Sequence, residues 1–183
     1  VDKNAALYYY PQPVIPFAQS AFDSKMTIHL EDETSKLFLL EIISCGRNAH
    51  EERFQYRRFS SKVLLYRGEK LIYRDNTRYE PGKMPMEGIG LYEGFTHMAN
   101  LFLSKLCDRG DADGLDRTSE LKEKIWQILD EDSEVDGGVT RLTTGDLALR
   151  IFGHRAQKLQ QIADKIKEIY TSCQINHKSV MNE

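Results

Sequence analysis

The sequence predicts an α+β fold, mainly β with two helices, in which a stack of strands precedes the helical part. Three observations support this fold class. Residues 7–106 contain at least five stretches with the composition or the period of strands and no convincing helix. Residues 108–183 contain a helical stretch, short extended pieces and a long amphipathic helix. A chain of 183 residues with 40% hydrophobic residues suits one well-cored domain, so we expect the strands of 1–107 and the elements of 108–183 to share one core.

The first extended stretch, residues 8–17, is rich in aromatic and β-branched residues, which favour strands. Pro11, Pro13 and Pro16 confine it to a sheet edge or a polyproline-like ribbon, because proline has no backbone N–H to donate. The chain has no initiator Met and opens on this apolar segment, so we interpret it as a fragment that lacks an N-terminal part. Because an open edge invites pairing with other chains, we expect self-association through Tyr8 to Phe17.

Four further strands follow. The stretch "MTIHL" at 26–30 alternates apolar and polar residues, the period of a half-buried strand. The stretch "KLFLLEIISC" at 36–45 is apolar on both faces, which indicates a strand between two layers. Residues 53–67 and 70–77 are strand-like and are separated by Gly68 and Glu69, the length of a tight hairpin loop.

The remainder of the chain changes from strand to helix. Residues 78–90 hold three glycines and two prolines and predict an irregular loop. Residues 95–106 fit either period, and we interpret them as a strand. A helix is expected from about residue 116, with Leu121, Ile125, Ile128 and Leu129 on one stripe and Trp126 at its flank. Short extended pieces follow at 136–153, and residues 154–173 form the clearest amphipathic helix.

Composition and motifs exclude several classes of function. A net charge of −3 gives no broad basic field for binding nucleic acid. No apolar run approaches the roughly 20 residues of a membrane-spanning helix, and the N-terminus does not resemble a leader. Three widely spaced cysteines form neither a disulfide framework nor a closed zinc site, so we expect a cytoplasmic protein. Nucleophile-elbow and phosphate-loop motifs are absent from the sequence.

Glu41 is a carboxylate in the middle of the apolar stretch 36–45. Strand parity places it on the same face as Leu39 and Ile43. A buried carboxylate without a partner is costly, so Glu41 requires a partner or a wet cavity. Two interpretations remain open: a buried ion pair with Arg47, which is the nearest candidate partner, and a water-filled polar passage through the β core.

The five histidines are isolated in the sequence, so we expect no cofactor that is bound permanently. His50 is the only histidine beside a pair of carboxylates, Glu51 and Glu52. This stretch is either a solvated loop or a transient contact for a borderline metal ion such as nickel or zinc, because imidazole and carboxylate suit these ions without a closed cage.

Several blocks follow one another in order along the chain: "PVIPFAQSAF", "EIISCGR" followed by "EERF", "LIYRDNTRYEP", and "GVTRLTTGDLALRIFG" before the last helix. Together they resemble the urease accessory protein D family, called H in some bacteria. The likeness runs from about Pro13 to Tyr170 and would account for the later part of a family member. Glu51 stands where the family commonly has glycine, which puts the expected tight turn in doubt, whereas Glu52 and Phe54 match.

The resemblance implies a β-helix-like stack of strands with two helices and a role as a scaffold in urease maturation rather than as an enzyme. Such a scaffold would bind apo-urease, recruit accessory protein F and, through it, the GTPase G, and assist nickel insertion as a chaperone. A water-filled tunnel is the proposed nickel route in this family. On that view Glu41, Glu52 and His50 are candidate transit residues, and Arg47 would hold the carboxylates in place.

Two other functions are compatible with the sequence. One is a β-rich hydrolase that uses Glu41 and Glu52 as paired carboxylates, with one pKa raised by burial. The other is a general interaction domain whose last helix lies in a partner's groove. Tyr92, Phe95 and Trp126 are candidate docking anchors, because aromatic residues dominate many interfaces, although a place in the core suits each of them better.

Overall fold

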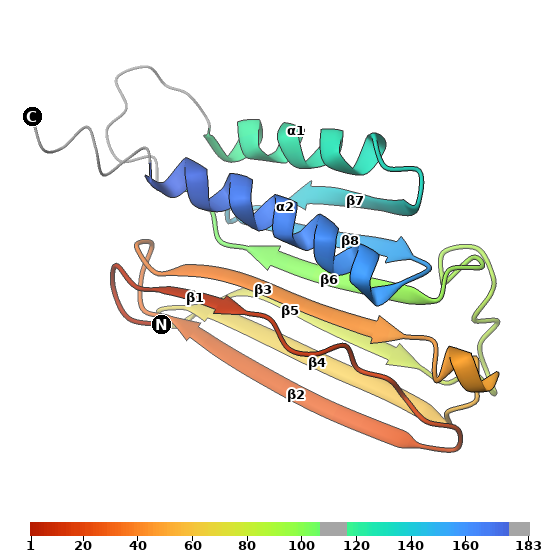
Figure 1. The fold of residues 1–183 in the computed structure, drawn as a ribbon. Helices are drawn as coiled ribbons and strands as arrows, with labels where there is room; N and C mark the ends of the chain where they lie inside the picture. Colours follow the sequence, from red (N-terminus) through yellow and green to blue (C-terminus); the bar gives the residue numbers. More distant parts are fainter. Residues whose placement is uncertain (107–116, 176–183) are drawn as a thin grey trace, which may run out of the picture.

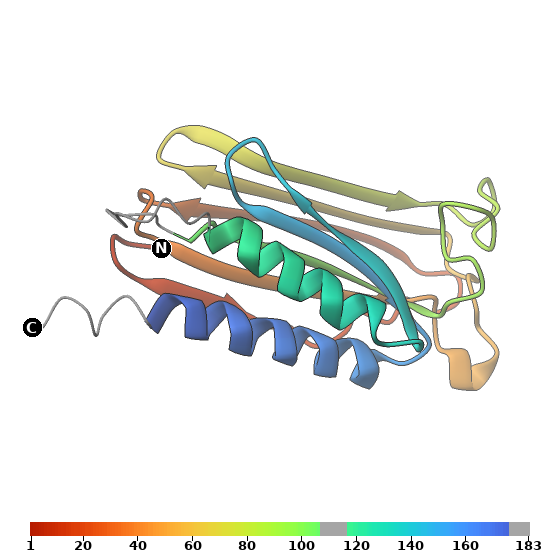
Figure 2. The same cartoon turned by 90° about the horizontal axis from the view of Figure 1, so that it is seen from above.

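The computed structural model describes residues 1–106 and 117–175 (Figure 1). Two β-sheets and two helices form three layers, with a five-stranded sheet between the helices and a three-stranded sheet (Figures 1 and 2). The five-stranded sheet has the order β1 (Ala6–Tyr9), β3 (Lys36–Ser44), β6 (His97–Leu103), β8 (Leu147–Gly153) and β7 (Val135–Arg141). The three-stranded sheet has the order β2 (Ala21–Leu30), β4 (Arg58–Arg67) and β5 (Lys70–Tyr79). The helices are α1 (Arg117–Asp130) and α2 (Ala156–Ile175), and a short 3-10 turn, η1, spans Asn48–His50.

The first four strands alternate between the two sheets. Strands β1 and β3 pair in parallel in one sheet, and β2 and β4 pair in parallel in the other. The chain therefore winds through two turns of a flattened β-helix, as the family resemblance implied. Strands β5 and β6 then pair antiparallel with β4 and β3 and end this winding pattern. Between β4 and β5, Gly68 takes a positive φ of 56°, which a tight hairpin loop requires at this position.

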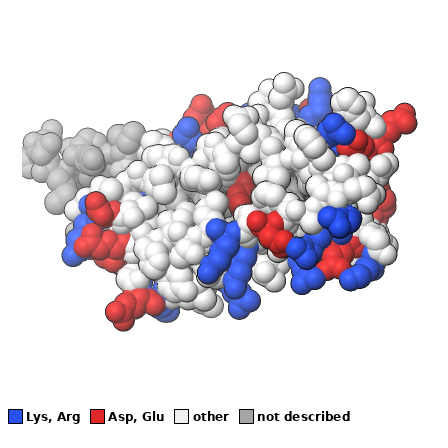
Figure 3. All heavy atoms as spheres, turned by 90° about the horizontal axis from the view of Figure 1, so that it is seen from below, with Lys and Arg blue, Asp and Glu red and all other residues white. Residues whose placement is uncertain are grey.

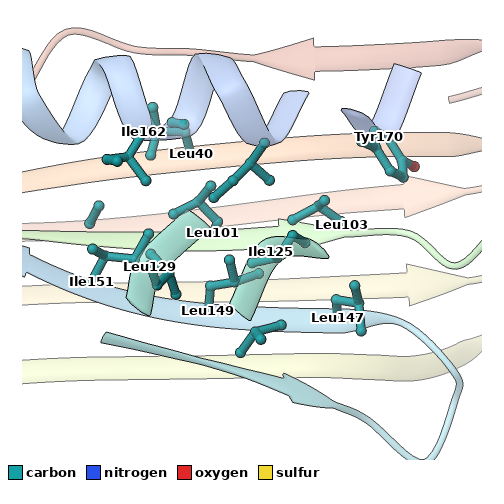
Figure 4. Packing of buried hydrophobic residues seen from close by; sticks show 14 of the residues in the cluster. Leu40, Leu101, Leu103, Ile125, Leu129, Leu147, Leu149, Ile151, Ile162 and Tyr170 are labelled. Atoms are coloured by element: carbon teal, nitrogen blue, oxygen red, sulfur yellow. The ribbon is translucent and has the colours of Figure 1, made fainter. Parts of the chain in front are cut away.

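Strand β3 is covered on both faces, as the apolar stretch 36–45 predicted. Phe38, Leu40 and Ile42 point toward the helices and join a cluster with residues of β6, β8, α1 and α2 (Figure 4). Leu39 and Ile43 point toward the three-stranded sheet. Each fully buried side chain of this kind contributes about 1.5–3 kcal/mol relative to exposure, so β3 anchors both interfaces.

Both predicted helices are confirmed, and their apolar stripes pack on the five-stranded sheet. The predicted stripe of α2 supplies Leu159, Ile162, Ala163, Ile166 and Tyr170, all of which are buried. The stripe of α1 is confirmed for Leu121, Ile125 and Leu129, whereas Ile128 is partly buried. No helix of the described residues is long and apolar enough to cross a membrane.

The ambiguous stretch 95–106 is a strand, β6, as interpreted from the sequence. The N-terminal stretch also lies at a sheet edge as predicted, because β1 is an outer strand and Val14 forms an isolated bridge with Ile43. Trp126 is not a core residue: 48% of its surface is exposed on α1. The sheet accepts a narrow stripe from α1, and Trp126 lies outside that stripe.

A buried ion pair joins the two sheets at one end. Arg67, the last residue of β4, donates from Nη2 to Oδ1 of Asp146 at 2.6 Å, just before β8. Asp146 is fully buried and also accepts bonds from the backbone N–H of Lys105 at 2.9 Å and from the hydroxyl of Thr144 at 2.6 Å. This carboxylate therefore connects β4, the end of β6 and the β7–β8 turn.

The variant Asp146→Asn should lower the free energy of unfolding by about 3 kcal/mol, because it removes the buried counter-charge of Arg67 and leaves only the half-exposed Glu33, 3.4 Å from Nε. Urea unfolding monitored by circular dichroism measures this difference. The matched control is Asp23→Asn, which breaks the exposed pair with Arg58 and should cost less than about 1 kcal/mol. Equal losses in the two variants would contradict a special role for the buried pair.

Candidate functional site

A layer of polar side chains crosses the interface between the two sheets. One apolar cluster lies on each side of it, one containing Leu39, Val63 and Phe102 and the other containing Ile43 and Phe59. Six of the strands that face this interface carry a polar residue at this level, between the two clusters. These residues, which we call the polar layer, are Ser24 on β2, Glu41 on β3, Ser61 on β4, Asp75 and Thr77 on β5, Asn100 on β6 and Arg150 on β8.

Strand register explains how these residues meet. On the five-stranded sheet, Glu41 lies opposite Asn100, and Asn100 lies opposite Arg150. On the three-stranded sheet, Ser24 lies beside Ser61, which lies opposite Thr77. The layer therefore runs across the strands, from the outer strand β2 to the neighbourhood of β8.

One half of the polar layer is connected by hydrogen bonds. Arg150 donates from Nε to Oδ1 of Asn100 at 2.9 Å and from Nη2 to Oδ1 of Asp75 at 3.4 Å. Thr77 donates its hydroxyl to the other oxygen of Asp75 at 2.9 Å. About half of the Arg150 side chain is exposed, at 49%, whereas that of Asp75 is 16% exposed. This end of the layer therefore opens to solvent at Arg150.

Glu41 is the exception in this network. Within the described residues, its carboxylate has neither a hydrogen bond nor an ion pair. Burial raises the pKa of Glu41, and the nearby negative charge of Asp75 raises it further. The charges of Asp75 and Arg150 cancel in their ion pair, so the charged part of the layer is neutral when Glu41 is protonated and carries one negative charge when Glu41 is ionised. The protonation of Glu41 therefore decides whether the layer is neutral or negative.

The layer has room and unmet hydrogen-bonding capacity for water. A pocket of ≈ 10 Å³ is lined by Glu41, Asp75, Asn100, Tyr73 and apolar neighbours, close to the smallest space that holds one water molecule. The amide nitrogen of Asn100 and the hydroxyl of Ser61 are buried and have no hydrogen-bond partner among the described residues. Such atoms cost about 1–3 kcal/mol each when unsatisfied, so the layer fits a hydrated interior.

Of the two interpretations of Glu41, the ion pair with Arg47 is wrong. Arg47 instead forms a two-point pair with Glu52, donating from Nε to Oε2 at 2.7 Å and from Nη2 to Oε1. Glu52 also accepts the backbone N–H of Ala18 at 3.1 Å, and the guanidinium of Arg47 lies over the ring of Phe17. The hydrogen bond from Arg47 holds the pKa of Glu52 below its usual range. These contacts fasten the ribbon before β2 to the loop after β3.

The same contacts separate the two carboxylates of the hydrolase hypothesis. Glu41 lies in the polar layer, three residues and thus about 10 Å before the end of β3, whereas Glu52 lies beyond Gly46. A single catalytic pair of Glu41 and Glu52 is therefore not present. Glu52 is also outside the polar layer, so Glu41 is the only one of the predicted transit residues that lies in it.

The tight turn at residue 51 forms although Glu51 replaces the glycine that is common in the family. Glu51 takes a left-handed conformation, with φ 59°, which glycine would adopt at lower cost. Gly46 has φ 136°, and a Cβ at this position would lie 2.1 Å from the carbonyl oxygen of Glu52. Only glycine fits at position 46, so the loop that carries Arg47 and Glu52 turns sharply away from the strand.

The other candidate residues lie away from the polar layer. His50 is exposed in η1. Tyr92 is fully buried in the second apolar cluster, so it is not available as a docking anchor. Phe95 is partly buried and packs against Phe152 and His154, which leaves Trp126 as the exposed one of the three. Within the described residues, no group of three or more His, Cys, Asp or Glu could hold a metal ion.

Comparison with known proteins agrees with the resemblance in the sequence. The family model described as UreD urease accessory protein matches residues 1–182. The chain belongs to this UreD family.

Its UreD relatives include proteins from several bacteria. It is 33% identical over 168 residues to the urease accessory protein UreD of Acetivibrio thermocellus, covering 91% of this chain and 60% of that protein. It is 31% identical to UreH of Helicobacter pylori strain J99 (93% and 60% covered) and 28% identical to UreD of Haemophilus influenzae (93% and 62% covered). The chain thus spans about 60% of the length of the relatives it matches. UreD is an accessory protein family and not a family of catalytic enzymes.

The sequence pattern predicted Glu41 as a site residue but did not predict Asp75, Asn100 and Arg150, which lie with it in the polar layer. A signal for Asn100 was present, because it is the single amide in an otherwise apolar part of the stretch 95–106. Asp75 and Arg150 carried no such signal, since charged residues are ordinary in half-exposed strands. Arg150 comes into the layer through the register of β8, and Asp75 through its hydrogen bonds with Thr77 and Arg150.

The variant Glu41→Gln should raise the free energy of unfolding at pH 7 by roughly 0.5–2 kcal/mol, the usual range for a stabilising substitution. The pKa of Glu41 is higher in the folded state than in the unfolded state. The free energy of unfolding of the original protein therefore falls as pH rises from the unfolded pKa through the folded pKa. Glutamine does not ionise, so the variant avoids this loss. Urea unfolding from about pH 3 to pH 8 measures the difference, which should vanish near pH 3, where Glu41 is protonated in both states. The exposed control Glu69→Gln should stay within about 0.5 kcal/mol throughout. A less stable Glu41→Gln at pH 7 would show that the carboxylate is a structural anchor.

The variant Gly46→Ala should destabilise the protein by more than about 2 kcal/mol, since the new methyl group overlaps the Glu52 carbonyl. Thermal unfolding gives the comparison with Gly82→Ala, where a Cβ meets nothing within 4 Å. Near-equal melting temperatures for the two variants would mean that the loop can relax without cost.

Proposed function

We propose that this chain is a non-enzymatic scaffold for urease maturation and that its polar layer is a hydrated path that assists delivery of nickel to apo-urease. Membership of the UreD family supports the role in maturation. The observation that carries the path is the polar layer itself, a row of oxygen-bearing side chains at one level of six strands. A purely structural interface would gain stability from apolar residues at these positions.

The chemistry of the layer suits a passing divalent cation better than a bound one. Glu41 and Asp75 supply carboxylate oxygens, and Asn100 supplies an amide oxygen that Arg150 already occupies in part. Oxygen donors bind nickel weakly compared with imidazole or thiolate. Because the pocket beside Glu41 has space for about one water molecule, a cation would exchange its water ligands for carboxylate oxygens in steps. Weak binding at successive positions is what transit requires.

Partners follow from the same proposal. The scaffold would bind apo-urease and accessory protein F, and through F the GTPase G. Trp126 is the exposed aromatic candidate for one of these contacts. The functional role of Arg47 and Glu52 is then to fasten the loop and ribbon beside this path, with the cation kept away from both.

Glu41→Gln and Glu41→Leu test the proposed path. Each is co-expressed, in place of the original chain, with the urease subunits and the other accessory proteins, and urease activity and nickel per active site are measured. We expect nickel content to fall several-fold with Glu41→Gln and further with Glu41→Leu, because leucine removes the hydration of the layer. Co-purification with accessory protein F should be unchanged in both.

A matched control and the predicted gain in stability make this experiment specific. Glu69→Gln removes an exposed carboxylate and should leave nickel content unchanged. Since Glu41→Gln is expected to be the more stable protein, a loss of nickel could not be attributed to unfolding. Full nickel content with both Glu41 variants would refute the path while leaving the scaffold role intact, and loss of F binding would indicate a docking defect instead.

A further inference from the structure

A pocket of ≈ 230 Å³ lies where the end of α1 leads into β7 (Figure 1). The ring of Trp126 and the acidic residues Asp130, Asp132 and Asp136 line it, together with Gly137 and neighbouring residues. Pockets for drug-sized ligands measure about 300–1,000 Å³, so this one suits a single side chain better than a cofactor. None of these residues belongs to the polar layer.

Two glycines leave the aromatic wall of this pocket uncovered. Trp126 is 48% exposed, and among the described residues neither a ring nor a cation stacks on it. A Cβ on Gly138 would lie 3.6 Å from its ring, and a Cβ on Gly137 would lie 2.5 Å from the carbonyl oxygen of Arg150. Strand β7 therefore places no side chain at these two positions. Glycine weakens a strand and often marks a place where a ligand approaches closely, so the pair indicates a ligand that contacts Trp126.

The carboxylates of the pocket exceed the cations beside them. Oδ2 of Asp132 pairs with Nζ of Lys158 at 2.8 Å. The carboxylates of Asp130 and Asp136 have neither an ion pair nor a hydrogen bond among the described residues. Asp130 is the last residue of α1, whose last turn contains no basic residue, and the negative end of the helix dipole lies there. The pocket therefore attracts a cationic group.

This excess of negative charge is local, because charges of both signs are interspersed elsewhere. Figure 3 shows Lys, Arg, Asp and Glu side by side on the face of the molecule that is seen from below. Exposed acids such as Asp23 and Glu87 have arginine partners. An unpaired acid at the negative end of a helix lowers the stability of that helix, and a cation from outside the described residues would offset this cost.

A metal ion does not fit the pocket. Among the described residues, no group of three or more His, Cys, Asp or Glu could hold one, so the three carboxylates do not converge on one point. A guanidinium group suits carboxylates that are spread out, because it is planar, stacks on an aromatic ring and donates several hydrogen bonds in its own plane. An ammonium group is compact and more strongly hydrated. The aromatic wall therefore favours arginine over lysine.

We propose that this pocket binds an arginine side chain of a partner protein, with the guanidinium stacked on Trp126 and paired with Asp130 and Asp136. Tryptophan and arginine are among the residues most enriched at the energetic centres of protein interfaces. The partner as the source of the arginine rests on the proposed scaffold role, whereas the pocket and the chemistry of its ligand do not depend on the nickel path.

The fluorescence of Trp126, the only tryptophan in the sequence, reports whether the pocket is occupied. The whole chain is titrated at constant ionic strength with N-acetylarginine amide, up to about 50 mM, and with N-acetylcitrulline amide, which has nearly the same shape and no charge. The arginine compound should give a saturable change in emission with a dissociation constant of about 1–10 mM, because each contact is weak at an exposed site. The citrulline compound should bind at least about 10-fold more weakly, because it lacks the charge.

Charge variants locate this binding. Asp130→Asn and Asp136→Asn should each raise the dissociation constant about 2–5-fold, and the double variant should raise it about 10-fold. The control Glu123→Gln removes an exposed carboxylate of α1 outside the pocket and should change nothing. Circular dichroism checks that each variant keeps the fold. Equal responses to the two compounds, a double variant that binds as the original chain does, or poor quenching of Trp126 by acrylamide would overturn the pocket.

Co-purification tests the source of the arginine. In the co-expression described above, the double variant Asp130→Asn/Asp136→Asn should recover several-fold less of the proteins that bind the original chain, whereas Glu123→Gln should recover the same amount. Undiminished recovery with the double variant would overturn a partner's arginine as the ligand. If the original chain recovers neither urease nor accessory protein F, the scaffold role fails and with it a partner as the source, while the titration still decides the pocket.

Discussion

The face-to-face packing of the two sheets is the constraint on which the other features of this structure depend. Sheets packed in this way lie about 10 Å apart, and here that separation is set by apolar clusters on both sides of the polar layer. The buried pair of Arg67 and Asp146 connects the sheets at one end. Beyond the layer, the pair of Arg47 and Glu52 fastens the loop after β3 to the ribbon before β2. With both regions held, the sheets cannot close on the layer between the clusters.

This arrangement explains how the protein tolerates polar groups in its interior. A carboxylate without a partner and two unsatisfied polar atoms would normally drive an interface to collapse or to take up apolar residues. The apolar contacts of β3 on both faces offset that cost, because the same strand is anchored to the helices and to the second sheet. Glu41 therefore lowers the stability of the protein while it contributes to the polar layer. A residue that costs stability in this way is expected where it is retained for function.

Much of the fold could be predicted from the sequence, because most strands and both helices have clear hydrophobic periods. This local pattern predicted that the stretch 36–45 is covered on both faces, and it predicted the face on which Glu41 lies. The surroundings of Glu41 did not follow from it. Strand β3 ends at Ser44 and Gly46 turns the chain away, so Arg47 pairs with Glu52, and Glu41 has no ion pair among the described residues. Asp75 and Arg150 come from distant strands. The pairing register brings Arg150 to the level of Glu41, and the packing of the two sheets brings Asp75 beside them.

The direction of the polar layer explains where this interior meets solvent. In a β-helix, a row of residues at one level runs across the strands and therefore along the axis of the stack. Here the row runs from Ser24 on β2 to Arg150 on β8, where about half of the arginine side chain is exposed. Access to the polar interior is thus determined at Arg150, because the register of β3, β6 and β8 places Glu41, Asn100 and Arg150 in one row.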